Sequence, residues 1–249
     1  MSPKLGIVWA PAEAFRIFGS FGHGFRAPSE SQLFRQGRAA GTVDLRPVRA
    51  NNLEIGAGGF IGSRVSYDVA LYHMRKNNDL LTFTRSDGST ETVNAGETLH
   101  RGVEVGIAAA LPADSRLDLA FSRAFHTYEQ WSPRPDTDYS GNRMEAAPAR
   151  TASASLTWSP DRWERANASL DVQHVGPYWM DAANTSRYEG HTTVALRAQL
   201  PVTSRVALFG RLTNALNERY AELARYTTAR GRELAPGMPR ALYVGARFR

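Results

Sequence analysis

The sequence predicts an all-β fold, an antiparallel β-barrel that crosses a membrane. Three observations lead to this prediction. Apolar and polar residues alternate with a period of two along the whole 249-residue chain, which is the pattern of strands with one apolar face. The segments between the alternating runs are short and long in turn. No run reaches the roughly 18 to 20 consecutive apolar residues that a transmembrane helix needs.

The alternation defines eleven strands. It is clearest from Ala166 to Gln173, where every apolar side chain falls on one face and every polar side chain on the other. Thr193 to Leu200 and Leu242 to Phe248 repeat this pattern. Eight more segments have it and are also expected to be strands: 5–9, 15–17, 53–55, 65–71, 103–107, 117–121, 152–158 and 206–212.

The connections between these strands alternate in length. The short ones carry Pro, Gly, Asp and Ser, as tight turns require, and they span 11–14, 62–63, 112–115, 159–164 and 201–204. The long ones span 26–50, 75–98, 129–149, 176–190 and 215–239, and Ser86-Asp87-Gly88-Ser89 within the second is typical of a type I′ hairpin tip. An up-and-down barrel with periplasmic turns and extracellular loops produces this alternation. A soluble sandwich is not expected to place short connections at one end and long connections at the other.

The two faces of the predicted strands differ in chemistry. One is aliphatic and carries aromatic residues near the strand ends, as membrane-facing strands do; these are Trp9, Trp158, Tyr178 and Trp179. The other is polar, with Arg16, Asp68, Glu104, Asp118, Asn167, Asp171, Arg197 and Arg211. In a wide barrel the polar face lines a wet lumen, and in a sandwich it faces solvent. Both interpretations fit a single strand, and the loop alternation favours the barrel.

Composition and motifs give no sign of an enzyme, a metal site or a cofactor. The chain has no cysteine, which excludes thiolate metal sites and Cys nucleophiles. Its six histidines show no metal-ligand spacing, and no Gly-x-Ser-x-Gly elbow is present. The glycine-rich segment 56–62 precedes an alternating strand and not a helix, so it is not a phosphate loop. The net charge of +6 comes from scattered arginines, a distribution that argues against nucleic-acid binding.

Several segments, in order and spacing, resemble one family. They are Phe21 to Ser29, Leu45 to Pro47, Asn52 to Gly56, Val69 to Asn77, Asn94 to Gly96, Arg101 to Glu104, Asn214 to Tyr220 and Pro236 to Arg240. Together they make the chain similar to the C-terminal part of TonB-dependent outer-membrane receptors over essentially its whole length. The resemblance implies a barrel of about 22 strands filled by an N-terminal plug. Residues 1–249 would then be about half of that barrel domain, located in the bacterial outer membrane.

The resemblance also implies what the rest of the protein supplies. We expect a signal peptide, the plug and the first half of the barrel to be encoded before Met1, which we interpret as an internal start or a truncated gene model. The partners would be outer-membrane lipid, the barrel-assembly machinery, the missing plug and barrel half, and the TonB complex acting through that plug. The implied function is energised uptake of a scarce ligand, an iron–siderophore complex. A passive porin-type channel and a soluble extracellular β-sheet binding protein are the alternatives.

The long loops would hold the ligand in such a receptor. Arginine and aromatic side chains suit anionic or aromatic iron chelates, through charge-assisted hydrogen bonds and stacking. The candidates are Arg26, Arg35, Arg38, Trp131, Tyr139, Arg143, Trp179, Tyr188, Arg225 and Tyr226. In the family the last strand ends on an aromatic residue that the assembly machinery reads. Here Gly245 and Phe248 are the candidates for that signal, although the chain finishes on Arg249.

Overall fold

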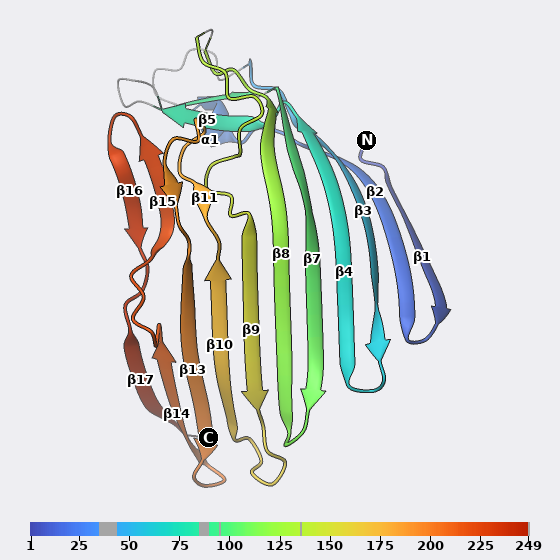
Figure 1. The fold of residues 1–249 in the computed structure, drawn as a ribbon, viewed down its shortest axis with the longest axis vertical. Coiled ribbons are helices and arrows are strands. Elements are labelled where there is room, and N and C mark those ends of the chain that lie inside the picture. The colour runs from blue at the N-terminus through green and yellow to red at the C-terminus, as the bar shows by residue number, and fades with distance from the viewer. Residues whose placement is uncertain (35–43, 85–89, 95, 135, 249) are drawn as a thin grey trace.

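The fold is one eleven-stranded antiparallel sheet that carries three small hairpins (Figure 1). The computed structural model describes residues 1–34, 44–84, 90–94, 96–134 and 136–248. Strand order follows the chain, β1-β2-β3-β4-β7-β8-β9-β10-β13-β14-β17. The eleven strands predicted from the alternation are therefore confirmed. Within the described residues the one α-helix is α1, Glu30–Phe34, and none is long and apolar enough to cross a membrane.

The strands of the large sheet vary in length. Their bounds are β1 Lys4–Ala12, β2 Phe15–Arg26, β3 Val48–Ile61, β4 Val65–Asn77, β7 Glu97–Leu111, β8 Ser115–Gln130, β9 Arg150–Trp158, β10 Asn167–Val175, β13 His191–Pro201, β14 Val206–Thr213 and β17 Ala241–Phe248. The hairpins pair β5 Leu80–Thr84 with β6 Thr90–Asn94, β11 Tyr178–Trp179 with β12 Arg187–Tyr188, and β15 Ala221–Thr227 with β16 Gly231–Pro236.

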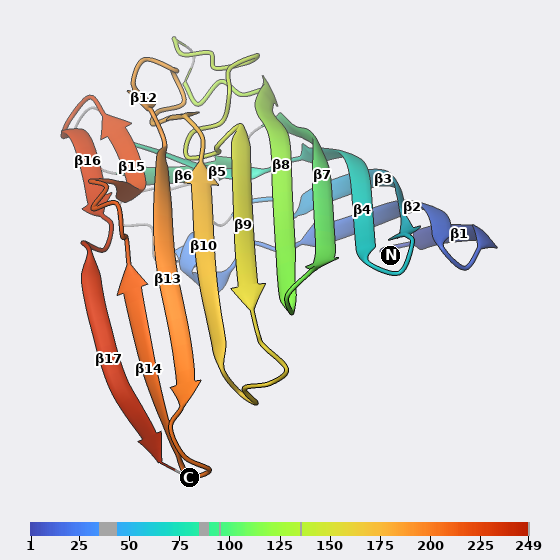
Figure 2. The same ribbon diagram turned by 60° about the horizontal axis from the view of Figure 1, so that its bottom comes forward.

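The sheet curves from β1 to β17 without closing (Figures 1 and 2). In the described part of the chain, β1 pairs only with β2, and β17 pairs only with β14. Each outer strand therefore leaves one row of backbone donors and acceptors without a strand partner. The sheet has the curvature of a barrel wall, but this chain does not complete the barrel.

One face of the sheet is polar and ion-paired. Asp171 accepts hydrogen bonds from Arg197 Nη2 at 2.8 Å and from Ser155 Oγ at 2.9 Å, and Arg116 Nη2 contacts Asp118 at 2.7 Å. A hollow of about 440 Å³ lies over this face and is lined by Ser66, Asp68, Asp118, Ser155, Asp171 and Gln173. This is the concave face, and it corresponds to the wet lumen predicted from the alternation.

The glycine-rich segment 56–62 forms part of β3 and of the turn that follows it. Arg16 on β2 and Asp68 on β4 form an ion pair across β3, between the strands on either side. Gly58 lies between them, and a Cβ there would come within 2.3 Å of Asp68 Oδ1. The small residue is therefore needed so that the ion pair can cross the strand, which gives this glycine a packing role.

The opposite face is apolar and exposed. Leu5 is 75% exposed, Leu53 57%, Leu71 54% and Val244 76%, and all belong to the aliphatic set of the alternation. Soluble monomers rarely expose apolar side chains side by side in this way. They are the expected surface of a strand that faces lipid. The inside-out distribution, with a polar concave face and an apolar convex face, therefore supports the membrane barrel.

Short and long connections lie at opposite ends of the sheet, as the alternation in their lengths predicts. The tight turns lie together at one end of the sheet, and the long loops with their three hairpins lie at the other (Figure 1). The predicted tip 86–89 lies outside the described residues, while the β5–β6 strands that flank it pair with each other. These two strands form their own sheet and do not extend β4 and β7, because the chain leaves the ladder at Asn78, whose φ is +56°.

Two asparagines explain why separate family-like segments occur together. The Asn214 side chain donates to the carbonyls of Glu218 and Met238 at 2.9 and 3.0 Å, and accepts from Glu218 N at 2.9 Å. It thereby joins the segments 214–220 and 236–240. Asn94 similarly donates to Arg46 O at 2.9 Å and accepts from Arg46 N at 2.7 Å. Four of the resembling segments are thus held together in pairs by hydrogen bonds between an asparagine side chain and the backbone.

Replacing Asn214 by Ala is expected to destabilise the barrel by about 1–3 kcal/mol, because the partly buried carbonyl groups of Glu218 and Met238 lose their side-chain donor. The measurement is the temperature at which the folded band in a detergent gel converts to the unfolded band. Asn217→Ala is the matched control, because Asn217 also has a positive φ (+55° against +46°) but is exposed. Equal shifts in the two variants would contradict the role given to the Asn214 side chain.

Candidate ligand-binding site

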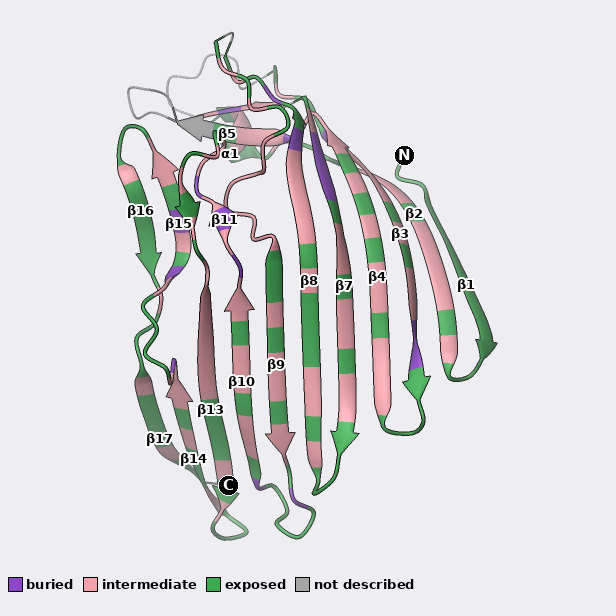
Figure 3. Ribbon diagram, viewed as in Figure 1, coloured by how far each residue is buried: buried purple, intermediate pink, exposed green. Residues whose placement is uncertain are grey.

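The long loops pack into a layer at one end of the sheet. Buried residues gather there, while the strands below are mostly half-buried or exposed (Figure 3). Two apolar clusters hold the layer together. The first consists of Tyr128 and Trp131, packed against Leu81, Tyr139, Met144 and Ala182. The second consists of Tyr178, Met180, Ala221 and Ala224, packed against Ala146, Tyr188 and Tyr226.

Trp131 and Tyr139, two of the predicted ligand residues, lie in the first cluster. Trp131 is 3% exposed, and its ring centroid lies 4.5 Å from that of Tyr128 and 5.0 Å from that of Tyr139. Burial raises the pKa of the half-buried Tyr139 hydroxyl. The Trp131 Nε1 group is buried and has no hydrogen-bond partner among the residues that the structure describes. These two rings therefore pack inside the loop layer.

Tyr188 and Tyr226 belong to the second cluster. The Tyr188 hydroxyl lies 2.9 Å from His191 Nδ1 and accepts a hydrogen bond from Ala221 N at 3.1 Å. Its neighbour Tyr178 accepts a hydrogen bond from Ala224 N at 2.8 Å, and burial raises the pKa of its hydroxyl. Tyr178, predicted as an interfacial aromatic residue, is instead only 7% exposed inside the layer. These tyrosines anchor the β15–β16 hairpin to the loop that contains β11 and β12.

Polar side chains join the loop after β8 to the loop after β11. Asn184 accepts from Arg143 N at 2.9 Å and donates to Arg143 O at 2.8 Å, and Asn142 donates to Ala182 O at 2.9 Å. Asp181 closes the second loop by accepting from Ser186 N at 2.8 Å. Asn184 has a φ of +58°, which asparagine tolerates better than most residues. The two loops are thus held in a fixed relative position.

Asp138 organises the outer part of the first loop. Its Oδ1 atom accepts from Ser140 Oγ at 2.6 Å, from Ser140 N at 2.9 Å and from Ser132 Oγ at 3.1 Å. The hydrogen bonds from Ser140, and then the bond from Ser132, hold the pKa of this carboxyl below its ordinary value. The carboxylate therefore stabilises a turn, and its exposed position places that turn at the surface of the layer.

The arginines among the predicted residues occupy different places. Arg26, the last residue of β2, and Arg225 in β15 are exposed. Arg143 is half-buried, with its guanidinium 4.4 Å from the centre of the Phe125 ring. Trp179 is half-buried and pairs with Arg187 in the β11–β12 hairpin. Arg35 and Arg38 lie outside the described residues. The layer therefore brings Trp131 and Tyr139 together, and Tyr188 and Tyr226 together, but leaves Arg26 and Arg225 at separate exposed positions.

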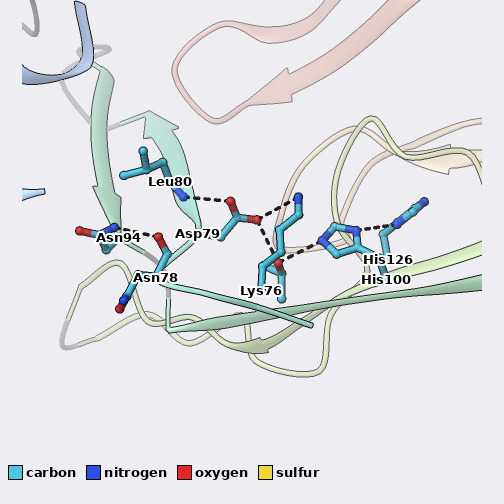
Figure 4. A network of polar contacts seen from close by, with 8 residues as sticks. Lys76, Asn78, Asp79, Leu80, Asn94, His100 and His126 are labelled. Atoms are coloured by element: carbon cyan, nitrogen blue, oxygen red, sulfur yellow. Dashed lines mark hydrogen bonds and ion pairs between the residues drawn. The ribbon is translucent and has the colours of Figure 1, made fainter. Parts of the chain in front are cut away.

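A partly buried chain of polar contacts runs from Lys76 through Asp79 and His100 to His126 (Figure 4). Asp79 Oδ2 lies 3.6 Å from Lys76 Nζ and accepts from Thr98 Oγ1 at 2.9 Å. Thr98 Oγ1 lies 3.1 Å from His100 Nε2, and His100 Nδ1 lies 2.8 Å from His126 Nδ1. This chain fixes the root of the β5–β6 hairpin to β7 and β8. In the described residues no three His, Cys, Asp or Glu side chains are placed to hold a metal ion.

The sequence places Asn94 and Asn214 within segments that resemble the family but predicts no contact for them, and it predicts no role for Asp79 or Asn184. Each joins segments that the period-two pattern cannot relate, because that pattern reports only which face of a strand a residue occupies. Their signal in the sequence is weak: Asn and Asp at loop positions. The candidate assembly residues lie in β17, where Phe248 is 76% exposed. A Cβ on Gly245 would come within 2.5 Å of the Phe209 ring.

Comparison with known proteins decides the family. Residues 1–215 match the family model described as TonB dependent receptor-like, beta-barrel. The chain belongs to the TonB-dependent receptor family. Members of this family are outer-membrane β-barrel transport receptors, not enzymes. The resemblance inferred from the sequence motifs is thus confirmed.

Solved structures of this family have the same fold. The ferric yersiniabactin uptake receptor FyuA from Yersinia pestis matches with a TM-score of 0.77 and 19% identity, over 98% of this chain and 36% of that one. The siderophore receptor PiuA from Acinetobacter baumannii gives 0.77 and 18%, over 98% and 35%. The copper transporter OprC gives 0.79 and 19%, over 98% and 38%. The chain therefore spans little more than a third of the length of these TonB-dependent receptors.

Replacing Asn184 by Ala is expected to loosen the loop layer, because it removes the paired bonds to the Arg143 backbone. A net loss of about 1–2 kcal/mol would raise the rate of proteolytic cleavage in residues 139–145 roughly tenfold. Limited proteolysis of the receptor in detergent measures this rate. Thr228→Ala, an exposed change near the tip of the β15–β16 hairpin, is the control. An unchanged cleavage rate in Asn184→Ala would contradict the role given to the hydrogen bonds between Asn184 and the Arg143 backbone.

Proposed function

We propose that this chain forms half of the barrel of a receptor that takes up a scarce ligand by energised transport, and that the ligand is an iron–siderophore complex. Family membership supports transport, and the loop layer supports recognition. Of the similar structures, one is a siderophore receptor by name, one is a ferric yersiniabactin uptake receptor and one is a copper transporter. A chelate with exposed anionic or aromatic groups fits the arginine and aromatic content of the loops.

The open sheet supports the proposal that a further barrel half exists. In lipid every backbone donor and acceptor needs a partner within the protein, so open sheet edges are costly. The free edges of β1 and β17 would be covered by strands that precede Lys4, which would close a barrel of about 22 strands. The plug would fill that barrel and contact the TonB complex. The exposed Phe248 in β17 would be read by the barrel-assembly machinery.

The loop layer divides the candidate ligand residues into two groups. Trp131, Tyr139, Tyr188 and Tyr226 are packed within the layer and would act mainly by holding its shape. Arg26 and Arg225 are exposed, so their guanidinium groups are available for charge-assisted bonds to an anionic chelate. Arg35 and Arg38 stay predictions from the sequence, because they lie outside the described residues.

The test expresses the complete reading frame in iron-starved bacteria that have an outer membrane but lack siderophore receptors of their own. Radioactive iron is supplied on carboxylate, catecholate or hydroxamate chelators. We expect uptake of at least one chelate that stops when the proton-motive force is collapsed. Arg26→Gln with Arg225→Gln is expected to weaken binding of that chelate about tenfold or more, given roughly 1.5–3 kcal/mol for a charged hydrogen bond. Arg64→Gln, in the turn between β3 and β4 at the opposite end, is the control.

Two results would contradict the proposal. Uptake that continues after the proton-motive force is collapsed and rises linearly with concentration would identify a passive porin-type channel. A protein that is monodisperse in water without detergent would support the soluble binding protein instead.

A further inference from the structure

A group of arginines lies on the apolar, convex face of the sheet near its loop end. Arg101 on β7 pairs with Phe125 on β8, and Arg123 on β8 pairs with Arg150 on β9. Successive residues alternate between faces of a strand, so Arg123 and Phe125 point to the same side as Leu119 and Phe121, which are both exposed apolar residues. Cross-strand partners share a face, which places Arg101 and Arg150 on that side as well.

A fourth arginine reaches the same place from the loop. Arg143 forms a β-bridge with Thr127, two residues beyond Phe125. Its guanidinium lies 4.4 Å from the centre of the Phe125 ring, and that of Arg123 lies 5.3 Å from it. Burial, followed by the positive charges of Arg101 and Arg123, lowers the pKa of Arg143. Two guanidinium groups therefore lie near one phenyl ring, and Arg101 and Arg150 are the strand partners of Phe125 and Arg123 on the same face. We name Arg101, Arg123, Arg143 and Arg150 the rim arginines.

Within the described residues, the rim arginines have no carboxylate at ion-pair distance. The neighbouring basic residue on this face, Arg75, is paired with Glu97 at 3.6 Å. The concave-face arginines Arg16, Arg116 and Arg197 each have an aspartate partner. Four positive charges without a counter-charge repel one another unless an anion binds among them.

The rim arginines lie at the depth in the membrane where lipid headgroups are expected. Leu111, at the turn end of β7, faces the same side as Arg101, ten residues away. At a rise of about 3.4 Å per residue this is about 34 Å along the strand. For a tilt of about 40° it corresponds to about 26 Å across the membrane, close to the roughly 25 Å apolar band of a transmembrane barrel. The rim arginines thus lie where acyl chains give way to headgroups on the loop side.

We propose that the rim arginines bind the phosphate groups of a phosphorylated lipid in the outer leaflet. Guanidinium groups donate paired hydrogen bonds to phosphate oxygens, and the Phe125 ring between them offers an apolar contact for the acyl chains below. The assignment to the outer leaflet rests on the proposed orientation of the barrel. The lipid site is independent of the ligand that the receptor transports.

The test titrates the purified complete receptor, in neutral detergent, with bis-phosphorylated lipid A, with the same lipid stripped of phosphate, and with inorganic phosphate. The variant is R101Q/R123Q/R143Q/R150Q. The charge-matched control is R64Q/R205Q/R219Q/R240Q, four exposed arginines elsewhere. We expect native protein and control to bind the phosphorylated lipid about tenfold or more tightly than the stripped lipid, and the variant to lose this preference.

Equal preference in the variant and the native protein would overturn the proposal, as would inorganic phosphate binding as tightly as the phosphorylated lipid. If the fourfold variant does not assemble, R123Q/R150Q replaces it, because both side chains are exposed in neighbouring strands, and it is expected to reduce the preference in part. Iron uptake distinguishes this proposal from the proposed function. Loss of lipid preference with uptake retained supports the lipid site whatever the transported ligand is.

Discussion

Backbone hydrogen bonding in a medium without water is the constraint on which this structure depends. Each strand of the large sheet forms backbone hydrogen bonds with its antiparallel neighbours. Within the described residues, β1 and β17 are the two strands of this sheet that have one edge without a strand partner. A membrane admits this arrangement only when the edges are covered. The curvature of the sheet, its open edges and its apolar convex face are therefore consequences of a single requirement, the closure of a barrel within lipid.

The loop layer follows a different rule. It lies outside the apolar band. Like a small soluble domain, it is held together by buried aromatic residues and by polar contacts between fixed side chains. Trp131 is 3% exposed and Ala224 is 0% exposed, whereas most residues in the strands below are half-buried or exposed. A recognition surface that is rigid before the ligand arrives loses less conformational freedom on binding. The buried chain from Lys76 to His126 contributes to that rigidity by joining the β5–β6 hairpin to the barrel wall.

The strands, their order and their two faces could be predicted because the period of two is a local property of the sequence. Leu170 and Asp171 already show which side of β10 faces lipid. The loop layer could not be predicted in the same way, because its contacts join distant residues: Asn94 meets Arg46, and Tyr178 meets Ala224. Residue type alone predicts a role in ligand binding for Trp131 and Tyr139, and the same aromatic character also suits the packed positions that they occupy. The rim arginines became visible only when the register aligned β7, β8 and β9.

The direction of the side chains in β8 tests the central claim most directly. The chain has no cysteine, so Leu119→Cys and Ala120→Cys each introduce a single reactive thiol on opposite faces of the strand. In the complete receptor assembled in membranes, we expect Leu119→Cys to resist a water-soluble maleimide, because a thiol in lipid is neither wetted nor ionised, and to react with it once the protein is unfolded. Ala120→Cys is expected to react with the same reagent in the assembled receptor. Equal reaction of both positions with the water-soluble reagent would contradict a barrel wall that faces lipid on one side and a wet lumen on the other.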